Sequence, residues 1–324
     1  MTTLEGAAGS RSGVTVRRIL RDYAIVWATI LLFIFLSLTT ANFATATNLR
    51  NILDQQATVL IVAAVTTLTV IAGGFDVSLS AIYILSPLVA LRVENTSGSI
   101  ALAIAAGMLT GLSAGIVNGF IVAKLRINSF IATLATSFVF FGLAYWVSDK
   151  SILRPNDLGF REFSTTKILG LNSATWIAIL VVAIAWFTLE RTRAGRYVFA
   201  AGGNPDAATL SGVRVPRVLW ACFAMGGLAA GLAGAIQSSQ TLSAQASDDF
   251  SFVFAVIAAV VVGGTSIAGG QGAVWRSVVG VLFIAVLVNG FNLNGIDPIF
   301  QRVIQGVVIL IAVGVDAWTR SRHT

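Results

Sequence analysis

Ten apolar stretches, separated by short polar or basic segments, follow one another along the chain of 324 residues. Each stretch is close to the about 20 residues that a helix needs to cross the hydrocarbon core of a bilayer, although the second and third are short. The pattern therefore predicts an all-α polytopic membrane protein with about ten transmembrane helices. The stretches cover residues 23–40, 56–73, 79–93, 99–123, 128–147, 173–190, 218–237, 251–270, 274–294 and 299–318.

These stretches form one expected transmembrane domain, residues 23–318, between an N-terminal tail, 1–22, and a C-terminal tail, 319–324. An even number of spans places both tails on the same side of the membrane. Lysine and arginine are concentrated in the segments on that side, above all in residues 191–217, and this bias is typical of cytoplasmic loops. We expect both termini and the 191–217 loop to be cytoplasmic.

The first apolar stretch has an alternative interpretation. Arg17 and Arg18 precede it, and the small residues Ala44 and Ala46 follow it, which is also the pattern of a cleaved secretory signal. On the opposite side of the membrane, residues 148–171 mix charges of both signs with proline and glycine. We expect this segment to be a loop or a short surface helix that could meet an external partner.

Composition narrows the class of protein. Hydrophobic residues make up 56% of the chain and charged residues 11%, whereas soluble domains are about 25% charged. The net charge of +7 does not indicate nucleic-acid binding, because the basic residues lie in short loops beside apolar stretches. A single cysteine, Cys222, excludes a disulfide within the chain and a cysteine metal cluster. We expect no catalytic residues and no metal site.

The basic segment 191–217 is punctuated by glycine and carries the start and stop signals of a short helix. Asn204 is a good N-cap, Pro205 suits the first helical position, and Asp206 complements the positive helix end. Gly212 can end the helix in the left-handed conformation. The alternative is an ordinary solvated loop. As a docking surface, the segment would use Gly195, Arg196, Tyr197, Gly202, Asn204, Pro205, Asp206, Ala207, Ala208, Ser211 and Gly212.

Two sequence repeats bear on helix packing. Glycine recurs every four residues at Gly107, Gly111, Gly115 and Gly119, a stripe that predicts a close helix contact, and Gly227 with Gly231, or Gly226 with Gly234, does the same in the seventh span. The tetrapeptide Val-Asn-Gly-Phe occurs at 117–120 and again at 288–291, five helices later. This odd offset predicts that helices 2–5 and 7–10 form an inverted repeat. Chance or a shared packing solution remains the alternative.

Four motifs resemble the ribose-type permeases of bacterial ABC sugar importers, over residues from about 50 to the C terminus. They are Ile71–Ser80, Asn118–Thr136, Gly195–Ala208 and Gly263–Trp275. Phe75, Ser129 and Ala200 depart from residues that are common in the family, which leaves the substrate less certain than the function. The chain has no Gly-x4-Gly-Lys-Ser/Thr loop for ATP phosphates.

The resemblance implies a multi-pass protein of the bacterial inner membrane that has three kinds of protein partner. Two permease copies, or one copy and a paralogue, form a dimer in the lipid bilayer. A cytoplasmic ABC ATPase binds ATP and Mg and docks beneath them. An extracytoplasmic binding protein delivers the sugar. We expect no cofactor in this chain itself, and no nucleic-acid partner.

A neutral sugar is recognised by amides, hydroxyls and aromatic faces rather than by net charge. Asp76 follows Gly73 and Gly74, so either it contacts the substrate or gates the path, or it or Ser78 caps the third span. Thr133 and Thr136 share one helix face, but each could instead bond its own helix backbone. The candidate residues of the translocation path are Asp76, Ser78, Asn118, Asn128, Phe130, Thr133, Thr136, Asn289 and Asn292. As twin positions of an inverted repeat, Asn118 and Asn289 are expected at similar depth in the central cavity.

The sequence does not carry the characteristic residues of two other classes of membrane protein. An ion-coupled secondary transporter usually has carboxylates in mid-membrane, and Asp76 and Asp316 lie at the ends of spans. An intramembrane hydrolase needs a nucleophile with a nearby base or paired aspartates, and the spans provide neither. Within the permease class, a branched-chain amino acid, an autoinducer, a polyol or a nucleoside remains an alternative to a monosaccharide.

Overall fold

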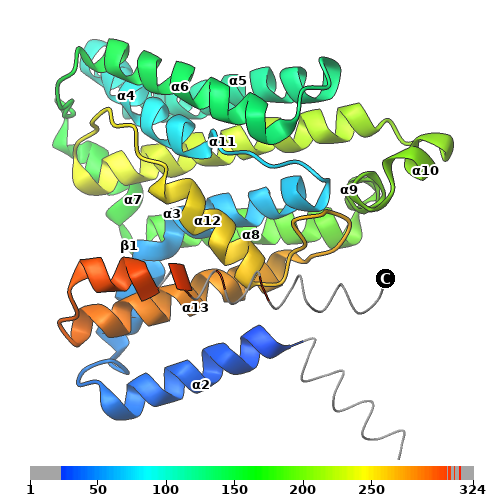
Figure 1. Cartoon of the computed structure of the whole chain (residues 1–324). Helices are drawn as coiled ribbons and strands as arrows, with labels where there is room; N and C mark the ends of the chain where they lie inside the picture. Colours follow the sequence, from blue (N-terminus) through cyan, green and yellow to red (C-terminus); the bar gives the residue numbers. More distant parts are fainter. Residues whose placement is uncertain (1–22, 305, 308–309, 311–313, 315–324) are drawn as a thin grey trace, which may run out of the picture.

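The computed structural model describes residues 23–304, 306, 307, 310 and 314, and within them it is built almost entirely of helices that lie roughly side by side (Figure 1). The long helices are α2 (Ala24–Thr39), α3 (Ala46–Ile71), α4 (Leu79–Ser97), α5 (Ile100–Lys124), α6 (Ser129–Ser148), α8 (Ser173–Arg191), α11 (Val215–Thr241), α12 (Ser251–Val262) and α13 (Val274–Leu293). The shorter elements are η1 (Leu158–Arg161), α7 (Glu162–Thr165), α9 (Arg193–Gly203), α10 (Pro205–Leu210) and the antiparallel pair β1 (Lys167–Ile168) and β2 (Leu171–Asn172).

Each of the first nine predicted stretches overlaps with one of these long helices. The tenth is helical from 298 to 304, and most of its remainder lies outside the described residues, as do the two predicted tails. Within the described part of the chain, six helices are long and apolar enough to cross a membrane, namely α3, α5, α6, α8, α11 and α13. The helical membrane architecture is confirmed, and the number of ten crossings stays a prediction.

Two predicted boundaries were wrong. Helix α12 ends at Val262 and not at residue 270, because glycines with positive φ, Gly264 at +88° and Gly269 at +85°, take the backbone out of the helix although the stretch remains apolar. Helix α3 begins at Ala46, ten residues before the apolar stretch at 56–73, because the Thr45 side chain accepts the Asn48 N–H at 3.3 Å. Hydropathy detects neither signal.

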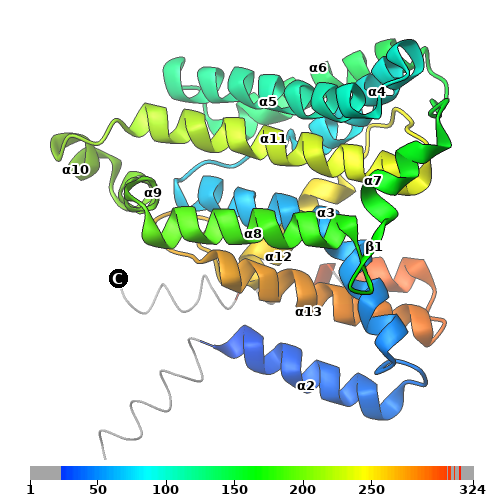
Figure 2. The same cartoon turned by 180° about the vertical axis from the view of Figure 1, so that it is seen from behind.

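The glycine stripe of α5 makes the close helix contact that the sequence predicted, and its partner is α11, which runs beside α5 in Figure 2. A Cβ atom added at Gly111 would lie 2.3 Å from the Gly227 carbonyl oxygen, and one at Gly115 would lie 2.4 Å from the Phe223 carbonyl oxygen. Any side chain at these positions would force the two backbones apart. The close approach therefore depends on glycine in both helices.

Helix packing also follows the predicted inverted repeat. Helix α5 packs on α4 and α11, and α13 packs on α12 and α3, which are the corresponding neighbours if helices 2–5 match helices 7–10. In Figure 1, α5 and α13 run in opposite directions. Where α3 meets α11, the free thiol of Cys222 is buried and lies 3.9 Å from the Leu68 carbonyl oxygen.

Candidate functional site

The predicted short helix of the 191–217 loop is α10, and its two ends are built as the sequence indicated. Asn204 Oδ1 accepts the Ala207 N–H at 3.0 Å. At the other end, the Val213 N–H donates to the Ala208 carbonyl and the Gly212 N–H to the Thr209 carbonyl, both at 3.0 Å. Gly212 has φ +85°, so this pair of bonds closes the helix through a glycine, as in a Schellman motif.

The same loop contains a second helix, α9, that was not predicted from the sequence. The Thr192 side chain accepts the Gly195 N–H at 3.3 Å, and Gly195, Val198 and Ala201 form the buried face. Their spacing of three residues was the available signal. It was obscured because the segment is rich in arginine and glycine, which resembles the composition of a loop.

Helices α9 and α10 extend beyond the ends of the long helices on one side of the bundle (Figure 1). Ala208 is buried and anchors α10, whereas Leu210 is 91% exposed, and on α9 Tyr197 is 47% exposed. The arginines on and beside them, Arg191, Arg193, Arg196, Arg214 and Arg217, are also exposed. An unpartnered leucine and a tyrosine in a basic surround are suitable for binding another protein.

The C-terminal end of α9 contacts two distant loops through close backbone approaches. We refer to the contact between residues 71–74, 202–203 and 269–272 as the glycine junction. The Gly270 N–H donates to the Ile71 carbonyl at 2.8 Å. A Cβ atom added at Gly202 would lie 1.7 Å from that carbonyl oxygen and 2.8 Å from the Gly270 nitrogen. The loop of α9 and α10 is thereby joined directly to the loops that lead into α4 and α13.

Beyond the glycine junction, the α3–α4 loop carries Asp76 and Ser78, both buried. Asp76 Oδ1 accepts from the Ser78 N–H at 2.9 Å and from Ser78 Oγ at 2.6 Å, and Asn118 Nδ2 of α5 donates to Ser78 Oγ at 2.6 Å. The Ser78 side chain does not cap α4, so that expectation was wrong, whereas the Asp76 carboxylate accepts the backbone N–H of Ser78, the residue that precedes the first turn. The two side chains instead join the loop to α5.

Helix α6 holds the same loop from another direction. Ser129 Oγ accepts the Phe75 N–H, and Thr133 Oγ1 accepts the Val77 N–H, both at 3.0 Å. Thr133 also donates to its own helix at the Ser129 carbonyl, at 2.8 Å. Thr136 bonds only within α6, to the Thr133 carbonyl at 3.2 Å, as the backbone-bonding alternative predicted.

Two predicted path residues, Asn128 and Phe130, lie at the N-terminal end of α6. Asn128 Oδ1 accepts the Phe130 and Ile131 N–H groups at 3.0 and 3.3 Å, which makes Asn128 the N-cap. The Phe130 ring is 46% exposed and its centroid lies 6.0 Å from that of Phe75. Phe130 is therefore the predicted path residue at this end with a large exposed aromatic face.

Asn289 and Asn292 lie elsewhere. Asn289 and Asn48 exchange two side-chain hydrogen bonds at 2.9 Å, near the start of α3, and Asn292 Oδ1 accepts from Gln301 Nε2 at 2.8 Å. Asn118 is in the half of α5 that packs on the start of α11, at the opposite end of the bundle (Figure 2). The expectation of similar depth for Asn118 and Asn289 was wrong, because an inverted repeat exchanges the two membrane faces.

The predicted path residues do not gather around one cavity. A groove of about 410 Å³ between α4, α5 and α6 is open to the outside of the bundle. Its lining is mostly apolar, with the hydroxyls of two residues as polar groups. It consists of Leu85, Leu109, Thr110, Ser113, Ala114, Val117, Phe140 and Leu143.

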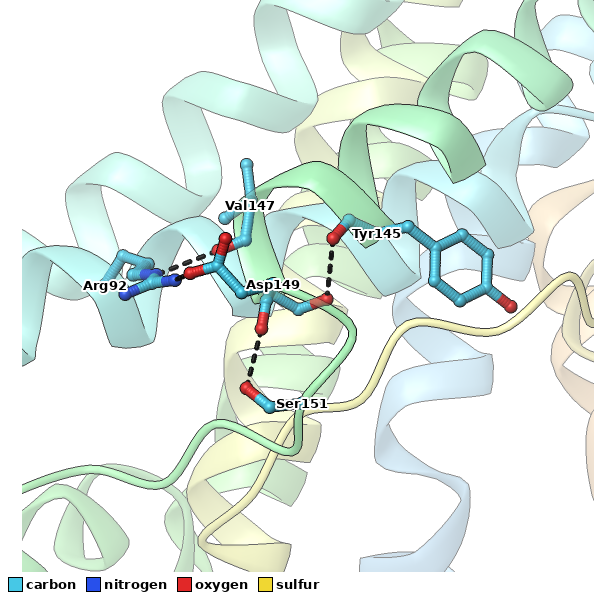
Figure 3. Close-up of polar contacts among 6 residues, drawn as sticks. Arg92, Tyr145, Val147, Asp149 and Ser151 are labelled. Atoms are coloured by element: carbon cyan, nitrogen blue, oxygen red, sulfur yellow. Dashed lines mark hydrogen bonds and ion pairs between the residues drawn. The ribbon is translucent and has the colours of Figure 1, made fainter.

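At the end of the bundle opposite to α10, the predicted 148–171 segment is fixed in place. Arg92 of α4 forms an ion pair with Asp149, and its Nε donates to the Val147 carbonyl at 2.8 Å (Figure 3). The buried Glu94 carboxylate accepts the N–H groups of Asn156 and Asp157, each at 2.9 Å. These bonds to α4 hold the 148–171 segment in a defined conformation at this end of the bundle.

A protein-family model for the permease component of branched-chain amino acid transport systems matches residues 48–313, most of the chain. The chain belongs to this permease family. The permease is 36% identical over 296 residues to the ribose import permease protein RbsC of Escherichia coli (strain K12), covering 89% of this chain and 91% of that protein. It is 33% identical over 313 residues to the E. coli (strain K12) L-arabinose transport system permease protein AraH, covering 97% and 95% of the two chains.

A further relative is the ribose import permease protein RbsC of Bacillus subtilis (strain 168), 37% identical over 288 residues, which are 88% of the permease and 89% of that protein. No solved structure matches the permease. Within its described residues, no group of histidine, cysteine, aspartate and glutamate side chains is arranged to hold a metal ion.

Proposed function

We propose that this chain is the transmembrane subunit of an ATP-binding cassette importer and forms the path for a monosaccharide or a similar polyol. The observation that carries the proposal is its likeness, over about nine tenths of each chain, to relatives named for the import of ribose and of L-arabinose. In such an importer, an extracytoplasmic binding protein delivers the sugar. The fixed 148–171 segment, at the end of the bundle opposite to α10, is the surface that we assign to this contact.

The 191–217 loop is the proposed docking site for the ABC ATPase, which binds the ATP and Mg. The capped α10, with Leu210 almost fully exposed, supports this assignment, as does the glycine junction behind it. An ATPase that moves α9 and α10 would displace the loops leading into α4 and α13. The proposed coupling residues are those predicted from the sequence, with Gly202 as the residue that touches the α3–α4 loop.

A second permease copy, or a paralogue, is proposed to complete the path. The groove between α4, α5 and α6 is open on one side, so the described residues of one chain do not enclose a passage there. Among the predicted path residues, Asp76, Ser78, Asn118 and Thr133 are buried, and we assign them to shaping the α3–α4 loop. Phe130 is the best placed to contact the solute directly.

We place the protein in the bacterial inner membrane with both termini and α10 in the cytoplasm, as the distribution of lysine and arginine favours. The test is uptake of radiolabelled solutes by cells with the gene deleted, using ribose, L-arabinose, a polyol and leucine. Loss of uptake of a pentose or the polyol is expected, with leucine uptake unchanged and the loss reversed by the intact gene. Loss of leucine uptake alone would reject the sugar assignment in favour of an amino acid.

A further inference from the structure

A small polar cluster, formed by Asp76, Ser78 and Asn118, lies where the α3–α4 loop meets α5. Their side chains are 2%, 0% and 0% exposed. Ser78 Oγ lies 2.6 Å from Asp76 Oδ1 and 2.6 Å from Asn118 Nδ2, so the carboxyl and the amide are neighbours on either side of one hydroxyl. Ser78 donates to the carboxyl group and accepts from the amide.

Two oxygen atoms of this cluster lack a hydrogen bond. Asp76 Oδ2 and Asn118 Oδ1 are buried and have no hydrogen-bond partner among the described residues. Both are acceptors when Asp76 is ionised, so neither can satisfy the other. A buried acceptor without a donor is costly, and a buried carboxylate without a cation is more costly still.

No basic side chain pairs with the Asp76 carboxyl group. Within the described part of the chain, Asp76 has no ion-pair partner, and the ion pair present there joins Arg92 to Asp149. The groups packed around the loop are hydroxyls and apolar side chains: Ser129 and Thr133 of α6 bond its backbone, and Thr69 and Phe223 lie beside Gly74.

One proton satisfies both oxygens. We propose that Asp76 is a neutral carboxylic acid whose Oδ2–H donates to Asn118 Oδ1. The three side chains then form a closed ring, in which Ser78 Oγ–H donates to Asp76 Oδ1, Asp76 Oδ2–H to Asn118 Oδ1, and Asn118 Nδ2–H to Ser78 Oγ. Each buried polar atom in the ring gains a partner, and no charge remains inside the protein.

The proton makes Asp76 a positioning residue, because it joins the α3–α4 loop, and through it the glycine junction, to α5. The inference is independent of the proposed function, since it concerns only the hydrogen bonds of this loop. A bound monovalent cation would satisfy the same two oxygens, but it would need Asp76 to be ionised. The hydrogen-bonded ring requires a protonated, neutral Asp76, whereas a cation site requires a negatively charged one.

The test compares Asp76→Asn with Asp76→Leu in the purified full-length protein. Asparagine keeps an acceptor for Ser78 and supplies an N–H for Asn118, whereas leucine has similar size without either. We expect the asparagine variant to unfold within about 2 °C of wild type and the leucine variant several degrees lower. Wild type is also expected to show an infrared band of a protonated carboxyl group at neutral pH, absent from Asp76→Asn.

Several results would overturn the proposal. Equal destabilisation by asparagine and leucine would show that the negative charge is needed. Stabilisation of wild type, but not of Asp76→Asn, by sodium chloride relative to choline chloride would identify a cation site. If neither variant folds, the wild-type spectrum decides, because the absence of a protonated carboxyl band at neutral pH excludes the neutral acid.

Discussion

The α5–α11 interface and the glycine junction are both built from glycine, but they use it differently. In the α5–α11 interface, glycines at regular helical spacing let two long helices approach along much of their length. In the glycine junction, Gly73, Gly269 and Gly270 have positive φ. The segments that meet there are two loops and the end of a helix. The first contact is extended and repeated, so we expect it to resist movement. The second is small and is made at loops, so we expect it to transmit movement between them.

The largest expected effect comes from breaking the extended contact. In Gly111→Ala, the new Cβ atom would lie 2.3 Å from the Gly227 carbonyl oxygen and 2.8 Å from the Gly231 Cα, both backbone atoms. We expect this overpacking to cost about 3 kcal/mol or more and to lower the yield of folded protein, measured by size-exclusion chromatography and thermal unfolding.

Gly142→Ala is the matched control, because Gly142 is also in a long helix and has nothing within 4 Å of its added Cβ. Alanine there should stabilise α6 by about 0.5–1 kcal/mol. If Gly111→Ala unfolds at the same temperature as Gly142→Ala, the α5–α11 interface does not depend on glycine.

The glycine junction should respond with a loss of coupling more than of folding. In Gly202→Ala, the Cβ atom would lie 1.7 Å from the Ile71 carbonyl oxygen, so the end of α9 has to move away from the α3–α4 loop. We expect a cost of about 1–3 kcal/mol, with folded protein that binds the ATPase but imports little sugar per ATP hydrolysed. Uptake and ATPase activity are measured together in proteoliposomes.

Gly203→Ala is the adjacent control, since its Cβ atom would meet the Gly270 Cα at 3.9 Å, an ordinary contact. This variant should import sugar at the wild-type rate. Equal sugar import per ATP in the two variants would show that the glycine junction does not transmit movement.

The smallest effect is expected at a contact made by side chains. Replacing Asn48 or Asn289 with leucine keeps the size and removes the paired amide bonds, worth about 0.6 kcal/mol on average between membrane helices. Each single variant should unfold slightly below wild type, and the double variant should lose less than the sum, as measured by thermal unfolding. Sugar flux per folded molecule should be unchanged. Impaired flux in well-folded protein would instead return Asn289 to the translocation path.

Sequence predicted the elements whose signals are local. Asn204, Pro205 and Gly212 lie within nine residues of one another, and they determine both ends of α10 without help from the rest of the chain. The stripe from Gly107 to Gly119 likewise predicted a close helix contact, because four-residue spacing fixes which face of a helix is smooth, but it did not identify α11 as the partner. Helix α12 was predicted too long because apolar residues continue after its glycines change the backbone conformation.

The candidate site was harder to predict, because its parts are brought together by tertiary structure. Ile71, Gly202 and Gly270 are far apart in sequence, and none of them carries a functional group that marks the glycine junction. The motif Gly263–Trp275 contributed to the resemblance to the permease family, but no function was predicted for its residues. The shared tetrapeptide gave Asn118 and Asn289 matching positions, but it could not show that the partner of Asn289 is Asn48, which lies at the start of α3 before the apolar stretch at 56–73.

The buried thiol of Cys222 has a practical consequence for spectroscopy. It is the single cysteine of the chain, and reagents that modify thiols need an accessible thiolate. The native sequence can therefore serve as its own unreactive background, without prior removal of cysteine. A cysteine introduced at the exposed Leu210 would carry a nitroxide or fluorophore at one defined place in each chain. In the proposed dimer of two copies, the distance between the two labels would report directly on how α10 moves during turnover.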